Sequence, residues 1–293
     1  MSEKETYLIT GAAGFIGAWI TETIYLNKIA QLKAGIRDWV SAARLGRSPV
    51  DIIPCDVMDK DQIEKALDGI TNVIHCVAAA PEVTIQGTRN MLEAALKAKI
   101  KRFVHISTTE VYGNVSGEID ESTPFQYGFS EYADSKIEAE KFCWAFSKKG
   151  LPVTVVRPPI VYGPYSRDWS ISIAQKLQSG NWGTFKKYGE GFCNLIYVSD
   201  LVSGILAASK EEAAIGEAFN LNGPDTLTWN QYFLHFNSAL NLPDLKEINT
   251  TQLKLQATLM SILKRTSKLV LQFFEDTIRQ VAGKSTEARS MIR

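Results

Sequence analysis

A glycine-rich turn near the start of the chain is the feature that most constrains its fold. The segment Gly11-Ala-Ala-Gly-Phe-Ile-Gly17 directly follows Tyr7-Leu-Ile-Thr10, which has the composition of a short buried strand. Gly11 allows a tight bend, Gly14 lets backbone approach a phosphate, and Gly17 lets a helix pack closely on the strand. The segment therefore predicts a strand–turn–helix unit whose helix N-terminus binds the pyrophosphate of a dinucleotide.

Strand-like and helix-like segments alternate through the first half of the chain. Apolar, β-branched runs predict strands at residues 7–10, 33–37, 51–55, 72–77, 102–107 and 153–157. Helical periodicity predicts helices between them, at about 16–27, 62–67, 87–98 and 132–148. This alternation predicts an α/β fold, with a Rossmann-type doubly wound parallel sheet that binds ligands at the carboxyl ends of its strands.

The pattern changes after Pro158, where prolines and glycines mark a loop. A helix is expected at about 169–177, a strand at 194–198 and another helix at 200–208. Residues from about 221 onward are polar and rich in aromatic side chains. We predict a dinucleotide-binding Rossmann domain at 1–165, with its sheet completed by about 194–220, and a smaller C-terminal substrate-binding domain from 166–193 and 221–293.

The segment 251–281 has apolar residues at helical spacing with interspersed basic ones. Helices packed on the substrate domain are the favoured interpretation, and a lid or a patch on an acidic membrane surface is the alternative.

Composition argues against several classes of function. The 293 residues include 32 basic and 32 acidic side chains without a run of five like charges, which disfavours nucleic-acid binding. No apolar run approaches the roughly 18 residues of a membrane span, and the polar start does not resemble a signal peptide. A cytoplasmic protein is therefore expected. The cysteines and histidines lack metal-ligand spacing, so we predict buried free thiols and no metal site.

A tyrosine and a lysine one helical turn apart supply the candidate chemistry. In Glu131-Tyr-Ala-Asp-Ser-Lys136, a phenol and an ammonium project from one helix face. A free phenol has a pKa near ~10, which a neighbouring ammonium and a positive nicotinamide would lower. Together with the glycine turn, the pair predicts hydride transfer at one carbon, with Tyr132 moving the proton. The alternative is an ordinary helix face without catalytic function.

Several motifs together resemble the extended short-chain dehydrogenase/reductases, which include NAD(P)-dependent sugar epimerases and dehydratases. They lie between about residues 6 and 223: Thr10-Gly-Ala-Ala-Gly-Phe-Ile-Gly17, Gly87-Thr-Arg-Asn-Met-Leu-Glu-Ala-Ala95, His105-Ile-Ser-Thr-Thr-Glu-Val-Tyr-Gly113, Tyr132-Ala-Asp-Ser-Lys136, Arg157-Pro-Pro-Ile-Val-Tyr-Gly-Pro164 and Ile196-Tyr-Val-Ser-Asp200. The resemblance implies a catalytic set of Thr108, Tyr132 and Lys136. In that set Thr108 holds the substrate oxygen and Lys136 also binds the nicotinamide ribose. The chain ends sooner than the family's usual C-terminal segment, so a truncated chain is one interpretation.

The expected cofactor site lies at the carboxyl ends of the strands. Arg37 follows the second strand, where an arginine accommodates the extra phosphate of NADP, whereas an acidic residue such as Asp38 favours NAD. NADP is therefore the expected cofactor, with NAD as the alternative. The expected cofactor-binding residues are Gly11, Gly14, Phe15, Ile16, Gly17, Arg37, Asp56, Val57, Ala78, Ala79, Ala80, Ile106, Tyr132, Lys136, Pro159 and Val161.

Some positions depart from the family pattern. Thr84 stands where an asparagine is usual, and Thr109 stands where the dehydratases have an aspartate, which disfavours 4,6-dehydration. Cys193 stands where nucleotide-sugar enzymes commonly carry an arginine that pairs with a substrate phosphate. A thiol cannot replace a bidentate guanidinium, so this position weakens the nucleotide-sugar interpretation. Lys186 and Lys187 are other cations that could take this role.

The sequence thus predicts an NADP(H)-preferring oxidoreductase that acts on a secondary alcohol or ketone. One alternative is an NAD-dependent nucleotide-sugar epimerase or 4-ketoreductase that uses the same residues. An alternative of another class is a non-catalytic dinucleotide-sensing regulator, whose expected mark, a broken Tyr/Lys pair, is absent. The expected partners are a small alcohol or ketone, or a sugar nucleotide, and by family analogy a second copy of the chain through helices at 87–98 and 132–148.

Overall fold

The computed structural model describes residues 5–248, which form two compact units. Within this range the first unit comprises residues 5–175 and 192–227, and the second comprises 176–191 and 228–248. The helices expected at 251–281 lie outside the described residues.

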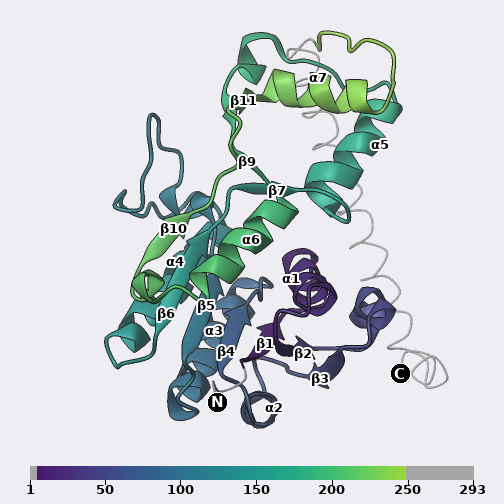
Figure 1. Ribbon diagram of the computed structural model, residues 1–293. Helices are drawn as coiled ribbons and strands as arrows, with labels where there is room; N and C mark the ends of the chain where they lie inside the picture. Colours follow the sequence, from purple (N-terminus) through teal and green to yellow (C-terminus); the bar gives the residue numbers. More distant parts are fainter. Residues whose placement is uncertain (1–4, 249–293) are drawn as a thin grey trace, which may run out of the picture. The chain divides into compact units, whose positions relative to one another are not determined.

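A seven-stranded parallel sheet forms the centre of the first unit (Figure 1). Its strand order is β10-β6-β5-β4-β1-β2-β3, so the order reverses between β1 and β4. Ligands bind at such a reversal, beyond the carboxyl ends of the strands. The order confirms the predicted doubly wound fold. The strands are β1 (Thr6–Thr10), β2 (Gln31–Ile36), β3 (Asp51–Pro54), β4 (Asn72–His75), β5 (Arg102–Ile106), β6 (Val153–Arg157) and β10 (Ala218–Asn220).

Helices cover both faces of this sheet and enclose two apolar cores. One core joins α1 and α6 to the sheet, and the other joins α2, α3 and α4 to its opposite face. The strands are buried on both faces because helices pack on each side, which explains their continuous apolar runs. The helices on the sheet are α1 (Phe15–Leu26), α2 (Lys60–Ala66), α3 (Pro81–Lys97), α4 (Glu131–Ser147) and α6 (Val198–Ala208). Elsewhere the described chain forms α5 (Ser172–Gln178) and α7 (Trp229–Ala239).

Shorter elements complete the described chain. Strand β7 pairs in parallel with β9, and β8 pairs with β11. These strands are β7 (Ile160–Tyr162), β8 (Phe192–Cys193), β9 (Leu195–Tyr197) and β11 (Leu227–Thr228). The short helices are η1 (Val40–Arg47), η2 (Thr109–Tyr112), η3 (Arg167–Ile171), η4 (Lys186–Gly189) and η5 (Glu212–Ala214).

The structure corrects two predicted boundaries. Helix α3 begins at Pro81, well before residue 87, because a proline is well suited to the first turn of a helix. The helix expected at 169–177 is instead the π turn η3 followed by α5, which begins at Ser172.

The second unit contains an aromatic cluster around α7. The ring of Phe233 contacts the rings of Trp182, Phe185 and Tyr232 at centroid distances of 5.7, 5.8 and 5.7 Å. A capping box between Thr228 and Gln231 begins α7. The aromatic side chains expected in this region therefore form a core, and a role in substrate binding stays a prediction.

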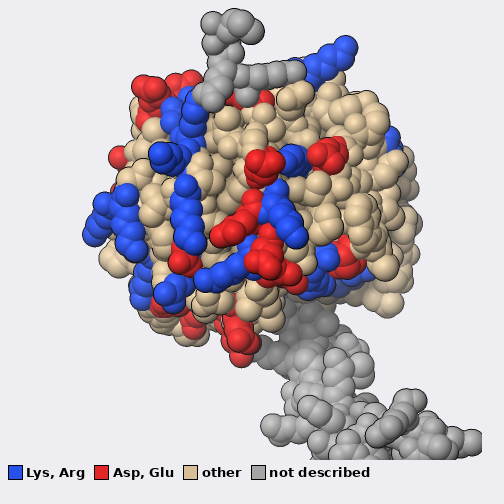
Figure 2. Space-filling view, turned by 90° about the horizontal axis from the view of Figure 1, so that it is seen from below, with Lys and Arg blue, Asp and Glu red and all other residues tan. Residues whose placement is uncertain are grey.

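The surface carries mixed charge. On the face in Figure 2, basic and acidic side chains are interspersed, in keeping with the balanced composition of the chain. Within residues 5–248, none of the helices combines the length and apolar character needed to cross a membrane. The same residues contain no group of three or more His, Cys, Asp and Glu side chains arranged to hold a metal ion.

Two histidines are buried side by side in the sheet. His75 of β4 and His105 of β5 are fully buried, with ring centroids 5.6 Å apart. The hydroxyl of Thr88 donates to the carbonyl of Thr84, so Nε2 of His75 must donate to Thr88 and Nδ1 must accept from Thr10. Burial, reinforced by the charge of a nearby lysine, lowers the pKa of His75 to about 3 and that of His105 well below 6.5.

The burial of His75 and His105 predicts that the folded protein loses stability in acid. Because their pKa values are lower in the folded state, the unfolded chain binds protons below about pH 6.5 that the folded chain does not. Each histidine should therefore lower the free energy of unfolding by about 1.4 kcal/mol per pH unit below that pH. We expect His105→Leu to make the loss of stability between pH 6.5 and 4.5 less steep, as measured by urea unfolding. Equal slopes for the variant and the wild-type chain would contradict this explanation.

Candidate active site

The glycine turn connects β1 to α1 through very close backbone contacts. Gly11 has a φ of +68°, and a Cβ there would lie 3.1 Å from backbone atoms of Cys76, after β4. A Cβ on Gly17 would lie 2.3 Å from the carbonyl oxygen of Gly11. Gly14 caps α1 without a side-chain hydrogen bond, so no capping side chain occupies the first-turn N–H groups. The turn therefore fits an anion such as a pyrophosphate.

The other residues predicted to bind cofactor follow the ends of successive strands. Parallel strands end at a common edge, so the residues at the ends of β2, β3, β4, β5 and β6 share the edge that carries the glycine turn. Phe15 and Ile16 begin α1, Arg37 follows β2, Asp56 and Val57 follow β3, Ala78, Ala79 and Ala80 follow β4, Ile106 ends β5, Pro159 follows β6, and Val161 lies in β7.

Within this set, Val57 has a clear packing role. Its side chain is buried, and a Cβ on Gly87 would lie 2.3 Å from its Cγ2, so α3 packs tightly on it. The neighbouring turn after β4 is held by Thr84, whose hydroxyl accepts from the Ala79 N–H and donates to the Ala79 carbonyl, both at 3.1 Å. The threonine that replaces the usual asparagine therefore fixes the position of this turn.

Arg37 is the more available cation beyond β2. Its side chain is 68% exposed, and its Nε lies 3.5 Å from Asp38. Asp38 accepts a hydrogen bond from the Ser41 N–H, which keeps the pKa of this carboxyl below its usual value. Arg44, by contrast, is hydrogen-bonded to Glu22 through two nitrogens. Of Arg37 and Arg44, Arg37 is therefore the one whose guanidinium is available to bind a phosphate.

Helix α4 carries the candidate tyrosine and lysine. Its N-cap is Ser130, whose hydroxyl accepts from the Ala133 N–H at 3.0 Å. Lys136 is 1% exposed, and its Nζ donates to the carbonyls of Val77 at 3.1 Å and Ile106 at 2.8 Å. Burial lowers the pKa of Lys136 to about 8. The lysine is thus anchored to the carboxyl ends of β4 and β5.

Tyr132 and Thr108 lie together, although Tyr132 is 38% exposed. Burial of the phenol, followed by the charge of Glu110, raises the pKa of Tyr132 to about 12, and a hydrogen bond with Thr108 acts in the opposite direction. Lys136 does not contribute to this shift, so the polypeptide alone does not produce the expected lowering of the pKa of Tyr132. The protein by itself keeps the phenol protonated at neutral pH.

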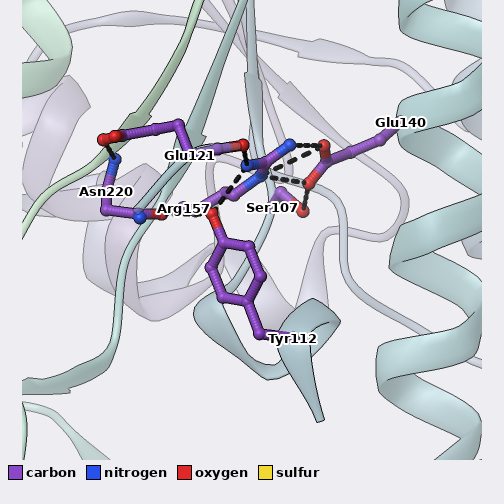
Figure 3. A network of polar contacts seen from close by, with 6 residues as sticks. All are labelled: Ser107, Tyr112, Glu121, Glu140, Arg157 and Asn220. Carbon is purple, nitrogen blue, oxygen red and sulfur yellow. Dashed lines mark hydrogen bonds and ion pairs between the residues drawn. The ribbon is translucent and has the colours of Figure 1, made fainter. Parts of the chain in front are cut away.

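A buried network of polar side chains, which sequence reasoning missed, includes Ser107, the neighbour of Thr108 in the chain (Figure 3). Arg157 at the end of β6 forms an ion pair with Glu140 of α4 at 2.7 Å, and both side chains are buried. Glu140 also accepts from the hydroxyl of Ser107, and Arg157 donates to the hydroxyl of Tyr112 at 2.7 Å. The network ties the turn that carries Thr108 to α4. An arginine that ends an otherwise apolar strand was the available sequence signal.

A hollow of about 640 Å³ opens beside η2. Its lining includes Glu110, Glu118, Asp120, Asn194, Asn220 and Asn222. Nearby in the chain, Cys193 is buried, and burial raises the pKa of its thiol to about 12, so the thiol is neutral. Lys186 belongs to the second unit and pairs with Glu247 at 3.1 Å.

Comparisons with known proteins agree with this geometry. The NAD dependent epimerase/dehydratase family matches residues 7–222. A UDP-N-acetyl-alpha-D-glucosaminuronate decarboxylase from Bacillus cytotoxicus is 30% identical over 252 residues, which cover 76% of both chains. A 3 beta-hydroxysteroid dehydrogenase/Delta 5-->4-isomerase from Mycobacterium tuberculosis is 25% identical over 260 residues, covering 79% of this chain and 68% of that protein.

Solved structures share the fold. The crystal structure of UDP-glucuronic acid 4-epimerase from Bacillus cereus, in complex with UDP-glucuronic acid and NAD, has a TM-score of 0.73 and 24% sequence identity. The match covers 83% of this chain and 85% of that one. The family match, the relatives and the sheet order together confirm what the motifs predicted: this chain is an enzyme of the NAD-dependent epimerase/dehydratase family.

Proposed function

We propose that this enzyme transfers a hydride between a nicotinamide dinucleotide and a secondary alcohol or ketone, with Tyr132 as general acid and base. The observation that carries the proposal is the grouping of Tyr132 with Thr108, on the sheet edge that also holds Lys136 and the glycine turn. A bound nicotinamide would accept or supply the hydride at its C4 carbon.

The protein's own groups would position the reactants and move the proton. Thr108 would hydrogen-bond the substrate oxygen, and Tyr132 would give that oxygen a proton during reduction or remove one during oxidation. An ammonium has three N–H donors, and Lys136 uses two on the carbonyls of Val77 and Ile106. The third would bind a ribose hydroxyl. Gly11, Gly14 and Gly17 would admit the pyrophosphate.

For the cofactor, we propose a preference for NADP. Support comes from the exposed guanidinium of Arg37 at the end of β2, where the adenosine ribose binds in this fold. NAD is the alternative, because Asp38 is adjacent and the epimerase from Bacillus cereus contains NAD. The two cofactors differ by a phosphate, so binding measurements separate them directly.

The substrate class has two candidates. The Bacillus cytotoxicus and Bacillus cereus relatives favour a sugar nucleotide, whereas the Mycobacterium tuberculosis relative favours a less polar alcohol. The neutral thiol of Cys193 offers no charge to a substrate phosphate, so a sugar nucleotide would need another group to bind its phosphates. A homodimer and a cytoplasmic location stay predictions.

Removal of the Tyr132 hydroxyl tests the proton-transfer role. We expect Tyr132→Phe to lower turnover about 10²–10⁴-fold, the usual contribution of general acid–base catalysis. Dinucleotide binding should be retained, because only one hydroxyl is lost. For the wild-type enzyme, alcohol oxidation should accelerate as pH rises, since the phenol must lose its proton to act as a base. Absorbance at 340 nm reports the reaction in a screen of alcohols, ketones and sugar nucleotides.

Two results would contradict that role: wild-type turnover in Tyr132→Phe, or an oxidation rate that does not change with pH. Tyr127→Phe is a matched control, because this tyrosine is exposed and its hydroxyl donates to the surface carboxylate of Glu138. The control variant should keep wild-type turnover.

Replacement of Arg37 tests the cofactor preference. Arg37→Ala should weaken NADPH binding about tenfold or more and leave NADH binding almost unchanged, because a charge-assisted contact to the extra phosphate contributes about 1.5–3 kcal/mol. Titration of the two reduced cofactors, followed by nicotinamide fluorescence, measures both constants. Arg47→Ala is the control, as this arginine contacts the hydroxyl of Tyr165. An unchanged ratio of the two affinities in Arg37→Ala would refute the assignment.

A further inference from the structure

The direction of the hydrogen bonds in the buried network is fixed by chemistry. A guanidinium can only donate, so Arg157 Nη1 donates to the Tyr112 hydroxyl at 2.7 Å. Burial raises the pKa of Tyr112, so this hydroxyl keeps its single hydrogen. That hydrogen must then go to Oδ1 of Asn220, which lies 2.8 Å away (Figure 3).

This chain of donors fixes the orientation of the Asn220 amide. Its Oδ1 faces Tyr112, and its backbone N–H donates to the carboxylate of Glu121 at 2.7 Å. Its Nδ2 has no hydrogen-bond partner among residues 5–248, and Asn220 lines the hollow beside η2. A flip of the amide would place two N–H groups against the Tyr112 hydroxyl, whose own hydrogen would lose its acceptor. The amide therefore carries an oriented donor at the wall of the hollow.

The charged side chains that line the hollow limit which ligand groups can bind to the Nδ2 donor of Asn220. Glu110, Glu118 and Asp120 belong to its lining, and the described lining includes no lysine or arginine. Hydrogen bonds from Ser122 lower the pKa of Asp120, so its carboxylate is ionised at neutral pH. A phosphate or carboxylate in the hollow would meet like charges, whereas a hydroxyl or carbonyl oxygen would not.

We propose that Asn220 is a substrate-binding residue whose Nδ2 donates to an uncharged oxygen of the molecule in the hollow, and that Arg157 and Tyr112 act as positioning residues for its amide. This inference rests on the proposed function, because the hollow opens beside the turn that carries Thr108. It narrows the substrate to molecules whose part in the hollow carries neutral hydroxyl or carbonyl groups, such as an uncharged sugar.

UDP-glucose and UDP-glucuronic acid are suitable probes of the hollow. The first carries a hydroxymethyl group where the second carries a carboxylate, and they are otherwise identical. Their binding is measured by calorimetry with NAD⁺ and, separately, NADP⁺ at saturation. We expect the wild-type chain to bind UDP-glucose more tightly. Asn220→Asp keeps an oxygen for Tyr112 but loses the donor, so it should bind UDP-glucose at least about tenfold more weakly. Asn222→Asp adds the same charge to the same lining and should show a smaller loss.

Further variants separate orientation from stability. Tyr112→Phe frees the amide and should weaken UDP-glucose binding a few-fold. Tyr7→Phe removes a comparable buried hydroxyl, bonded to Ser209 at the other end of the sheet, and should leave binding unchanged. If Asn220→Asp does not fold, as judged by its melting temperature and NADH binding, Asn220→Ser removes the donor without adding charge.

Equal losses in Asn220→Asp and Asn222→Asp would overturn the proposal, as would failure of the wild-type chain to bind either probe. Tighter binding of UDP-glucuronic acid would overturn the preference for an uncharged group. These results do not depend on the proton-transfer role, which fails separately if Tyr132→Phe keeps wild-type turnover.

Discussion

The buried ion pair between Arg157 and Glu140 is the interaction on which the candidate site depends. Two charges in the protein interior are costly unless hydrogen bonds satisfy their remaining donors and acceptors. Here the hydroxyls of Ser107 and Tyr112 meet that requirement. Ser107 and Tyr112 lie on either side of Thr108 in the chain. The hydrogen bonds that offset the cost of burying the ion pair therefore also hold the turn that carries Thr108 against α4.

The parallel sheet explains why these groups meet at all. Strand ends that are far apart in sequence come to one edge, where the carbonyls of Val77 and Ile106 hold Lys136. The same edge carries the glycine turn, whose backbone contacts exclude any side chain at Gly17. A lysine that is buried and anchored to backbone has a fixed position, which suits it to orient a ligand.

The sequence was enough to predict the fold, whereas the contacts within the candidate site became visible only in the structure. The order of strands and the glycine turn follow from local pattern, since apolar runs and glycine spacing record burial and close approach. The Arg157–Glu140 pair joins residues on different elements, and no periodicity within either element reveals the partner. The start of α3 at Pro81 differs from the prediction for another reason: the motif at Gly87 lies inside the helix and carries no signal for its first residue.

The pKa of Tyr132 indicates how the proposed chemistry would be divided between protein and cofactor. Burial and Glu110 hold this phenol at a pKa of about 12, and Lys136 does not offset their effect. The polypeptide therefore favours the protonated tyrosine, which is the form needed to reduce a ketone. For alcohol oxidation, the phenolate must be stabilised by a positive charge that arrives with the oxidised nicotinamide. Tyr132 would thus become able to act as a base only when the oxidised cofactor is bound, which would couple proton removal to hydride transfer.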